Sequence, residues 1–349
     1  MTIEETIYKA ITENGPIPFS QFMTMALYDP ENGFYATGGA GRRRDFITSP
    51  ESGPLFGKLV ATAIDQWWQE LGNPADLTFI EVGAGKGTLA RTILRSEFKC
   101  RDKLKYFGIE ISGFQRSKHP SEIESVETMP TDVENGIIFA NELLDNLPFD
   151  IFESTKDGKW KQVCIGIENG GLKEILIEEA IGQPDYAIEE IGIRVPSQKA
   201  AQDWLEKALK SLRKGRVIVI DYAVENFPVS PDHNWLRTYT KHERSHDPLS
   251  NPGTKDITSD VDISQLQKIQ TPALIRTQSQ WLKELGIDEL VNEGKRYWLE
   301  NVHKPDVVAL EARSRATESK ALLDDNGLGG FKVIEWDVKS SDQIAQDNP

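Results

Sequence analysis

The hydrophobic positions of the chain recur at two spacings, and each spacing predicts a different kind of element. Residues 3–13 and 54–71 place apolar side chains three and four positions apart, which predicts amphipathic helices. From residue 78 onward, short apolar runs alternate with helix-length segments. The runs are LTFIEVG, KYFGIEI, ESVETM, GIIFANE and RVIVIDY, followed by a helical stretch over 279–324 and a closing run, FKVIEWDV. Strands that alternate with helices predict an α/β fold with a doubly wound, mainly parallel sheet.

Two segments interrupt this alternation. Residues 149–182 contain strand-like runs joined by Asp157 and Gly158 and then by Asn169 and two glycines, which is the chemistry of tight hairpin turns. An antiparallel insertion is therefore predicted there. Residues 225–260 are polar and contain several prolines, so they are interpreted as a long ordered loop. The predicted organisation is an N-terminal helical cap over 1–75 and a main domain over 76–349 that carries both insertions.

Composition limits the class of protein. The chain has 349 residues, of which 38% are hydrophobic, so it can bury a sizeable core and is not a disordered chain. No stretch approaches the roughly 20 apolar residues of a membrane helix. The first residues, MTIEETIYKA, have neither a basic run nor an Arg-rich amphipathic pattern, which predicts a cytoplasmic protein. The two cysteines, Cys100 and Cys164, are expected to be buried, reduced thiols.

The charge balance narrows the choice of partners. There are 40 Lys and Arg against 55 Asp and Glu, a formal net charge of -15, so the field of the whole protein repels phosphate backbones and attracts cations. A basic partner or substrate is expected, whereas nucleic acid and membrane are not. The oligomeric state is left open.

The sharpest motif is IEVGAGKGTL at residues 80–89, a strand that leads into a glycine-rich turn and a helix. A dinucleotide-binding fingerprint would need glycine where Thr88 stands, and a phosphate-binding Walker loop would need glycine where Ile80 stands. The pattern that fits is ExGxGxG, the turn of class I S-adenosylmethionine methyltransferases. Its glycines let the backbone approach the amino-acid part of the cofactor. A tight structural turn that binds no ligand is the alternative.

S-adenosyl-L-methionine is therefore the predicted cofactor. The predicted cofactor contacts are Thr48, Ser49, Glu81, Gly83, Gly85, Gly87, Thr88, Glu110, Ile111 and Asn141. Glu110 ends the next predicted strand, where its carboxylate can accept hydrogen bonds from both ribose hydroxyls. The alternative for Glu110 is an ordinary surface glutamate.

The fourth predicted strand ends in NELLDNLP at residues 141–148. The carboxyl ends of the strands line the ligand crevice of a doubly wound sheet, so these side chains are expected to face the methyl group that is transferred. Glu142 and Asp145 are three apart and can share one face of a helical turn. As predicted catalytic residues, they would clamp a guanidinium or ammonium group and orient its nitrogen. The alternative is an acid pair that stabilises the start of a helix.

Residues 242–246 spell HExxH, the signature of zinc proteases. That chemistry needs His242 and His246 on one face of a buried helix. The flanks are polar, and Asp247 and Pro248 would stop a helix at once. No metal site is therefore predicted.

With these motifs in place, the chain resembles the MidA and mitochondrial complex I assembly factor seven family of methyltransferase-like proteins over nearly its whole length. The resemblance rests on TSPE around Ser49, on EVGAGKGTL, on NELLDNLP, on VIDY at 219–222 and on GLGGF at 327–331, in this order. The departures from the family pattern are Ala84, Lys86, Leu143, Leu144, Ala223 and Asp260.

The resemblance implies a class I methyltransferase fold and methyl transfer from S-adenosylmethionine. Protein arginine is the first choice of acceptor, because the mitochondrial member methylates an arginine of a respiratory complex subunit. Two other functions stay open. One is a methyltransferase for a hydroxyl or amine of a small molecule, and the other is a non-catalytic assembly factor that binds the cofactor for structure.

Overall fold

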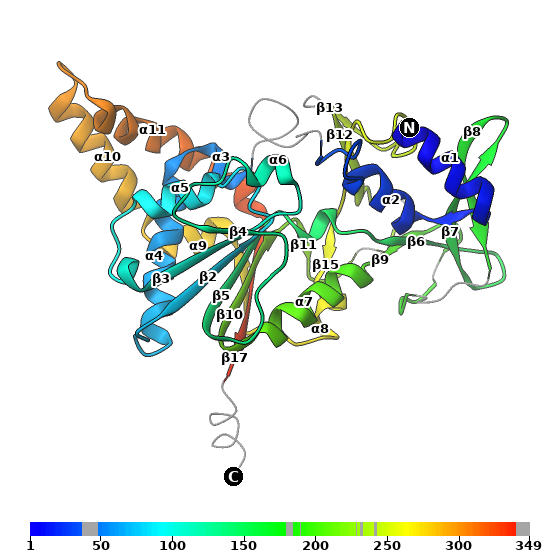
Figure 1. The fold of residues 1–349 in the computed structure, drawn as a ribbon, viewed down its shortest axis with the longest axis horizontal. Coiled ribbons are helices and arrows are strands. Elements are labelled where there is room, and N and C mark those ends of the chain that lie inside the picture. The colour runs from blue at the N-terminus through cyan, green and yellow to red at the C-terminus, as the bar shows by residue number, and fades with distance from the viewer. Residues whose placement is uncertain are drawn as a thin grey trace, which may run out of the picture. The chain divides into compact units, whose positions relative to one another are not determined.

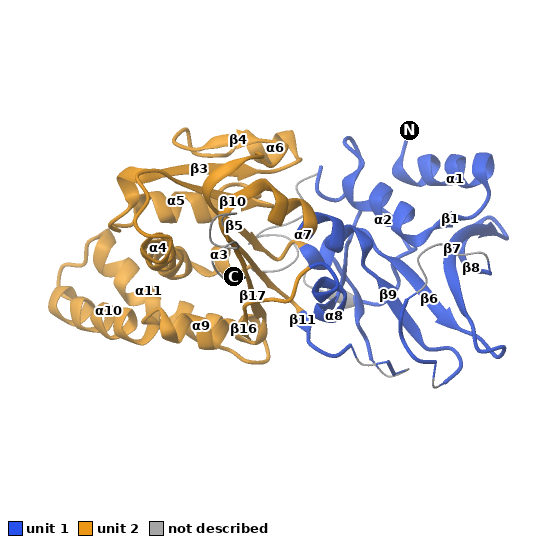
Figure 2. Ribbon diagram, turned by 90° about the horizontal axis from the view of Figure 1, so that it is seen from below, with its two compact units in different colours: residues 1–46, 144–205, 223–269 blue, residues 47–143, 206–222, 270–349 orange. Residues whose placement is uncertain are grey.

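The computed structural model describes residues 1–36, 48–178, 184–188, 190–227, 229–230, 233–240 and 243–339 (Figure 1). These residues form two compact units, each built from segments that are distant in the sequence (Figure 2). Unit 1 contains residues 1–46, 144–205 and 223–269, and unit 2 contains residues 47–143, 206–222 and 270–349. The division into a cap over 1–75 and a main domain remains a prediction, and the two units divide the chain at other positions.

Unit 2 is built on a seven-stranded sheet, counted over the described part of the chain. Its order is β16 (Leu274–Thr277), β17 (Lys332–Val338), β10 (Leu212–Asp221), β5 (Val133–Asn141), β2 (Leu77–Val82), β3 (Leu104–Ile109) and β4 (Glu124–Val126). The strands from β10 to β4 are parallel, whereas β17 is antiparallel to β10 and β16 is antiparallel to β17. The strand order changes direction between β2 and β5, so the sheet is doubly wound and the predicted α/β class is confirmed.

Helices cover this sheet through a shared apolar core. They are α3 (Ser49–Ser52), α4 (Pro54–Glu70), α5 (Thr88–Arg95), α6 (Gly113–Arg116), α9 (Gln278–Glu284), α10 (Ile287–Asn301) and α11 (Val307–Leu322), with short turns η1 (Arg101–Lys103) and η3 (Leu328–Gly330). The helix α7 (Lys199–Ser211) leads into β10. Aromatic rings form the centre of the core, where Trp281 of α9 packs on Trp67 of α4 and on Phe139 of β5. None of the helices in the described ranges is long and apolar enough to cross a membrane.

Unit 1 combines helices with small sheets, which are antiparallel except for the parallel pair of two-residue strands at 223–224 and 261–262. Its helices are α1 (Ile3–Asn14), α2 (Phe19–Tyr28), α8 (Ile263–Gln267) and the short turn η2 (Leu144–Asn146). Its larger sheet contains β1 (Ile17–Pro18), β6 (Asp150–Ser154), β7 (Trp160–Glu168), β8 (Gly171–Ile177) and β9 (Arg194–Ser197), and β11 (Ala223–Val224) pairs with β15 (Val261–Asp262). The strands β6, β7 and β8 pair antiparallel. The turn between β7 and β8 places Asn169 and Gly170 at φ 51° and 78°, the left-handed backbone that such a hairpin needs.

The interpretation of residues 225–260 as a long loop is wrong. This segment contains β12 (Leu236–Thr240), β13 (Glu243–Ser245) and β14 (Asp256–Ser259), which form a three-stranded antiparallel sheet. These strands bury polar and charged side chains beside the apolar Ile257. Arg237 of β12, for example, is 7% exposed and donates to Asp260 at 2.5 Å. A pattern of hydrophobic positions cannot detect strands of this kind.

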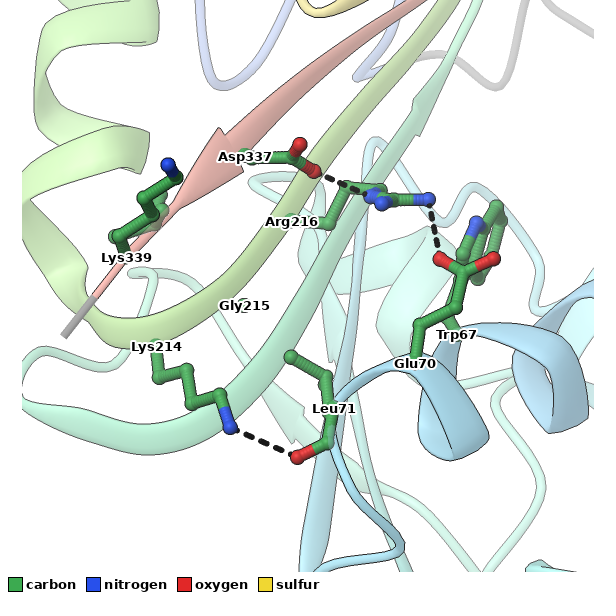
Figure 3. Close-up of a pocket in the computed structure, with 9 residues that line it drawn as sticks. Trp67, Glu70, Leu71, Lys214, Gly215, Arg216, Asp337 and Lys339 are labelled. Carbon is green, nitrogen blue, oxygen red and sulfur yellow. Dashed lines mark hydrogen bonds and ion pairs between the residues drawn. The ribbon is translucent and has the colours of Figure 1, made fainter. Parts of the chain in front are cut away.

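A network of ion pairs connects the sheet of unit 2 to α4 near the amino end of β10. It borders a cavity of about 170 Å³ whose lining includes Glu70, Lys214, Arg216 and Asp337 (Figure 3). Arg216 lies 2.9 Å from a Glu70 oxygen, 2.8 Å from Asp337 and 3.1 Å from Glu335. Lys214 donates to the carbonyl of Leu71 at 2.8 Å. Arg216 and Lys214 thus interact with groups of the protein itself. We therefore interpret the cavity as a structural feature that holds α4 against the sheet.

Replacing Arg216 by Met should destabilise unit 2. Glu335 is 2% exposed, and its burial raises its pKa, which Arg276 and Arg216 oppose. Removing Arg216 should lower the free energy of unfolding by about 2 kcal/mol. This loss is smaller than that for breaking a buried ion pair completely, because Arg276 remains 2.5 Å from Glu335. Urea unfolding measures the change. Arg213→Met, whose partners Asp132 and Glu134 are exposed, is the control and should leave the midpoint close to that of the wild type.

Candidate functional site

The glycine-rich turn lies at the point where the strand order of unit 2 reverses. It follows β2 directly, and its glycines Gly83, Gly85 and Gly87 have φ angles of 72°, 53° and 73°. Residues with a side chain rarely adopt this left-handed backbone, so the turn requires glycine at all three positions. The N–H groups of Gly83 and Ala84 both donate to the carbonyl of Ile109 in β3.

One side of this turn is open and the other is filled. A Cβ at Gly85 would meet nothing within 4 Å, whereas one at Gly83 would lie 3.2 Å from Cδ1 of Leu143 and one at Gly87 would lie 3.0 Å from Cδ of Pro120. The helix α5 starts at Thr88 without a side-chain cap. Its first N–H groups are therefore available to an anion such as a carboxylate.

Glu110 ties the turn to the end of β3. Its Oε2 accepts from the N–H of Gly85 at 3.0 Å, and its Oε1 accepts from the N–H of Ser112 at 2.8 Å. Burial raises the pKa of Glu110, while these two N–H groups and Arg116 lower it. A carboxylate has about four acceptor positions, so both oxygens keep capacity for hydroxyl groups. The neighbouring Ile111 is 55% exposed, which leaves an apolar side chain beside Glu110.

Glu81 lies inside the sheet rather than in the turn. It is 6% exposed, and its Oε2 accepts a hydrogen bond of 2.6 Å from the hydroxyl of Tyr106. Burial raises the pKa of Glu81 to about 8, although the bond from Tyr106 lowers it. The acid is therefore protonated at neutral pH. Its role as a cofactor contact stays a prediction.

The end of β5 is connected to the start of α3. The Oε1 of Glu142 accepts from the N–H of Ser49 at 3.2 Å and from Nδ2 of Asn141 at 2.9 Å. Ser49 is fully buried, and its hydroxyl donates to Gln278 at 2.8 Å. Thr48 precedes α3 and makes no side-chain cap. The structure thus brings together Ser49, Asn141 and Glu142 within unit 2.

The helical turn predicted for Glu142 and Asp145 does not form. Glu142 has a φ of 53° and stands before the short turn η2, which contains Asp145. Glu142 also lies next to the end of the first segment of unit 2, whereas Asp145 belongs to unit 1. In unit 1, Asp145 is 5% exposed and its Oδ2 accepts from the hydroxyl of Thr258 at 2.9 Å. The spacing of the two acids in the sequence does not predict this arrangement, because Glu142 has a left-handed backbone that ends the regular conformation.

Three further polar residues contact the predicted site residues or their neighbours. The hydroxyl of Tyr106 donates to Glu81, and Gln278 accepts from the hydroxyl of Ser49. Asp221 accepts from the N–H of Leu143 at 3.2 Å. Asp221 could have been found, since it is an acid at the end of an apolar strand just as Glu110 follows β3. No local signal marks Tyr106 or Gln278.

The HExxH segment does not form the helix of a zinc protease over the residues that the structure describes. His242 lies outside the described residues, while Glu243–Ser245 is the strand β13, paired with β12. His246 is exposed, and its Nδ1 lies 3.0 Å from the carbonyl of Leu236.

The donor and acceptor groups at the β2 and β5 ends fit an amino acid joined to a nucleoside. Oδ1 of Asn141 is buried and has no hydrogen-bond partner among the described residues, so it can accept from an ammonium group. The start of α5 suits a carboxylate, the open face at Gly85 admits the ligand backbone, and Glu110 suits ribose. A doubly wound sheet with this turn defines a Rossmann-like S-adenosylmethionine-dependent methyltransferase.

Comparison with known proteins agrees with this class. Residues 59–279 match the model of a family of S-adenosyl-L-methionine-dependent methyltransferases. The chain belongs to this family, as the resemblance implies, and S-adenosyl-L-methionine is its cofactor.

Named relatives and a solved structure are similar over most of the chain. The "Protein arginine methyltransferase NDUFAF7 homolog, mitochondrial" of Drosophila melanogaster is 27% identical, over 74% of this chain and 68% of the relative. The "Protein arginine methyltransferase NDUFAF7, mitochondrial" of Xenopus tropicalis is 28% identical, over 82% and 75%. A Burkholderia thailandensis protein solved with S-adenosyl-homocysteine has the same fold, with a TM-score of 0.82, 23% identity and coverage of 96% and 91%.

The predicted cytoplasmic location is corrected by these comparisons. The relatives from Drosophila melanogaster, Xenopus tropicalis and Homo sapiens all carry the word mitochondrial in their names. The absence of a basic or Arg-rich run in the first ten residues is therefore not a reliable guide to location.

Replacing Glu110 by Ala should weaken cofactor binding while the fold survives. Each charge-assisted hydrogen bond to ribose contributes roughly 1.5–3 kcal/mol, so the affinity should fall about tenfold or more. Calorimetry with S-adenosylmethionine measures the change, and Glu97→Ala, an exposed acid of the same unit, is the control. An unchanged affinity in Glu110→Ala would refute the ribose contact.

Replacing Glu81 by Gln should change how stability depends on pH. Because the pKa of Glu81 is raised to about 8, its favourable contribution is complete below about pH 4.5 and is lost as the pH rises through about 8. The glutamine side chain can still accept from Tyr106 but cannot ionise. The variant should therefore gain stability relative to the wild type as the pH rises from about 5 to about 9, measured by urea midpoints. A difference that stays constant with pH would contradict this account.

Proposed function

We propose that this methyltransferase acts on arginine side chains of a protein substrate. The observation that carries the proposal is the similarity to relatives named protein arginine methyltransferases, which extends over 74% and 82% of the chain. The net charge of -15 supports it, because an acidic enzyme attracts a basic protein.

Arginine is a demanding acceptor for methyl transfer. Its guanidinium has a pKa above about 12, so one nitrogen must be oriented and the positive charge balanced during the reaction. When bound, S-adenosylmethionine supplies an electrophilic methyl group. The protein's part is to hold the acceptor nitrogen in line with that methyl and to neutralise the cation with carboxylates.

Each unit contains acidic residues that support this proposal, and each set is described within its own unit. In unit 2, Glu142 follows β5 beside Asn141, at the cofactor end of the sheet. In unit 1, Asp145 lies near Asp256, which is 1% exposed and accepts from Tyr35 at 2.9 Å and from Asn146 at 3.0 Å. Burial, together with the charge of Asp145, raises the pKa of Asp256 to about 7. A cation stabilises two buried acids that repel each other, and Arg237, whose pKa is raised in part by Asp145, is one cation in these surroundings.

A labelling experiment separates this acceptor from the alternatives. The purified protein is incubated with tritiated S-adenosylmethionine and a cell lysate, and the labelled product is sized and hydrolysed. Label recovered as methylarginine in a protein supports the proposal. Label in a small molecule would favour a small-molecule methyltransferase, and cofactor binding without any label would favour an assembly factor; either result would overturn the proposal.

Neutralising Glu142 or Asp145 should separate catalysis from binding. If these acids hold the acceptor, Glu142→Gln and Asp145→Asn should lower methyl transfer by orders of magnitude while the cofactor affinity and the melting temperature change little. Glu168→Gln, an exposed acid of β7, is the control and should retain activity.

The contrary result for these variants is equally specific. Glu142 accepts from Ser49 at the start of α3, so a purely structural role would lower stability by about 1 kcal/mol, as loss of a helix cap does. A loss of stability that matches the loss of activity would contradict the role of these acids in acceptor binding.

A further inference from the structure

His119 lies against the glycine-rich turn, in the segment between α6 and β4 of unit 2. Its Nε2 is 2.9 Å from the carbonyl oxygen of Gly85, and its Nδ1 is 2.8 Å from Oγ of Ser125 in β4. A carbonyl oxygen can only accept, so Nε2 carries the proton and donates to Gly85. In the neutral ring, Nδ1 then accepts from the hydroxyl of Ser125.

Two glycines provide the space for this ring. A Cβ at Gly87 would lie 3.2 Å from Cδ2 of His119, and a Cβ at Gly108 of β3 would lie 3.2 Å from Cε1. Pro120 follows His119 and restricts its backbone to extended conformations. The ring is thus packed between the turn and the sheet.

The surroundings of His119 keep it uncharged. Burial lowers its pKa, and Arg91 and Arg116 lower it further, while the bond to the backbone at Gly85 raises it. Arg91 of α5 also donates to the carbonyl of Lys118, the residue before His119. The neutral ring with its proton on Nε2 is therefore the form present at neutral pH.

Gly85 is consequently held at both of its backbone polar groups. Its N–H donates to Glu110 at 3.0 Å, and its carbonyl accepts from His119 at 2.9 Å. We propose that His119 is a positioning residue for S-adenosylmethionine, which keeps Gly85 in the left-handed conformation that opens the turn to the cofactor. A turn that is already ordered loses less conformational freedom on binding. His119 itself acts through Gly85 and touches no reacting atom.

A pair of variants with similar size isolates the hydrogen bond from the packing. His119→Gln keeps an N–H donor and His119→Met fills the space without one. Calorimetry with S-adenosylhomocysteine should show a dissociation constant raised about fivefold or more in His119→Met and within about twofold of the wild type in His119→Gln. This readout needs no methyl acceptor, so it is independent of the proposed arginine substrate.

His246→Ala is the matched control, because His246 also contacts a backbone carbonyl, that of Leu236 at 3.0 Å, but is exposed and belongs to unit 1. Its affinity should equal that of the wild type. The proposal is overturned if His119→Met binds as tightly as the wild type, whatever its unfolding midpoint in urea. It is also overturned if His119→Gln and His119→Met are weakened equally, since packing alone would then explain the effect.

Discussion

The left-handed turn after β2 is the constraint on which the site depends. Three glycines with positive φ turn the backbone within five residues, between the end of β2 at Val82 and the start of α5 at Thr88. Such a turn has little rigidity of its own, because glycine loses the most conformational freedom on folding. The side chains of Glu110 and His119 supply the missing rigidity from β3 and from the segment before β4. The open face at Gly85 therefore depends on residues next to β2, β3 and β4.

The features that could be predicted from the sequence are those with a local cause. The apolar runs of β2, β5 and β10 are buried on both faces of the sheet, and the turn needs its glycines for steric reasons alone. The doubly wound sheet and the position of the turn follow from these two facts. Hairpin turns at Asn169 and Gly170 have the same local origin.

The remaining features come from contacts across long stretches of sequence. Ser49 bonds to Glu142 and to Gln278, residues that no periodicity connects to it. Glu142 adopts a left-handed backbone, so it does not share a helical turn with Asp145 as their spacing predicts. The polar strands β12 and β14 are stabilised by hydrogen bonds from Arg237 to Asp260 and from Thr258 to Asp145. Polar contacts of this kind stabilise a strand only when a partner that is distant in the sequence is in place. The local sequence pattern therefore does not indicate them.

The order of segments in the two units also constrains how the chain can fold during its synthesis. Unit 1 includes residues 223–269 together with residues 1–46, so its first helices must wait for more than half of the chain to emerge. In unit 2, β17 lies between β10 and β16, although it follows both of them in the sequence. Until β17 is made, β16 has no strand to pair with and the edge of β10 is uncovered. Such an edge can pair with other chains. During synthesis this edge therefore stays open to other chains until residues 332–338 have left the ribosome.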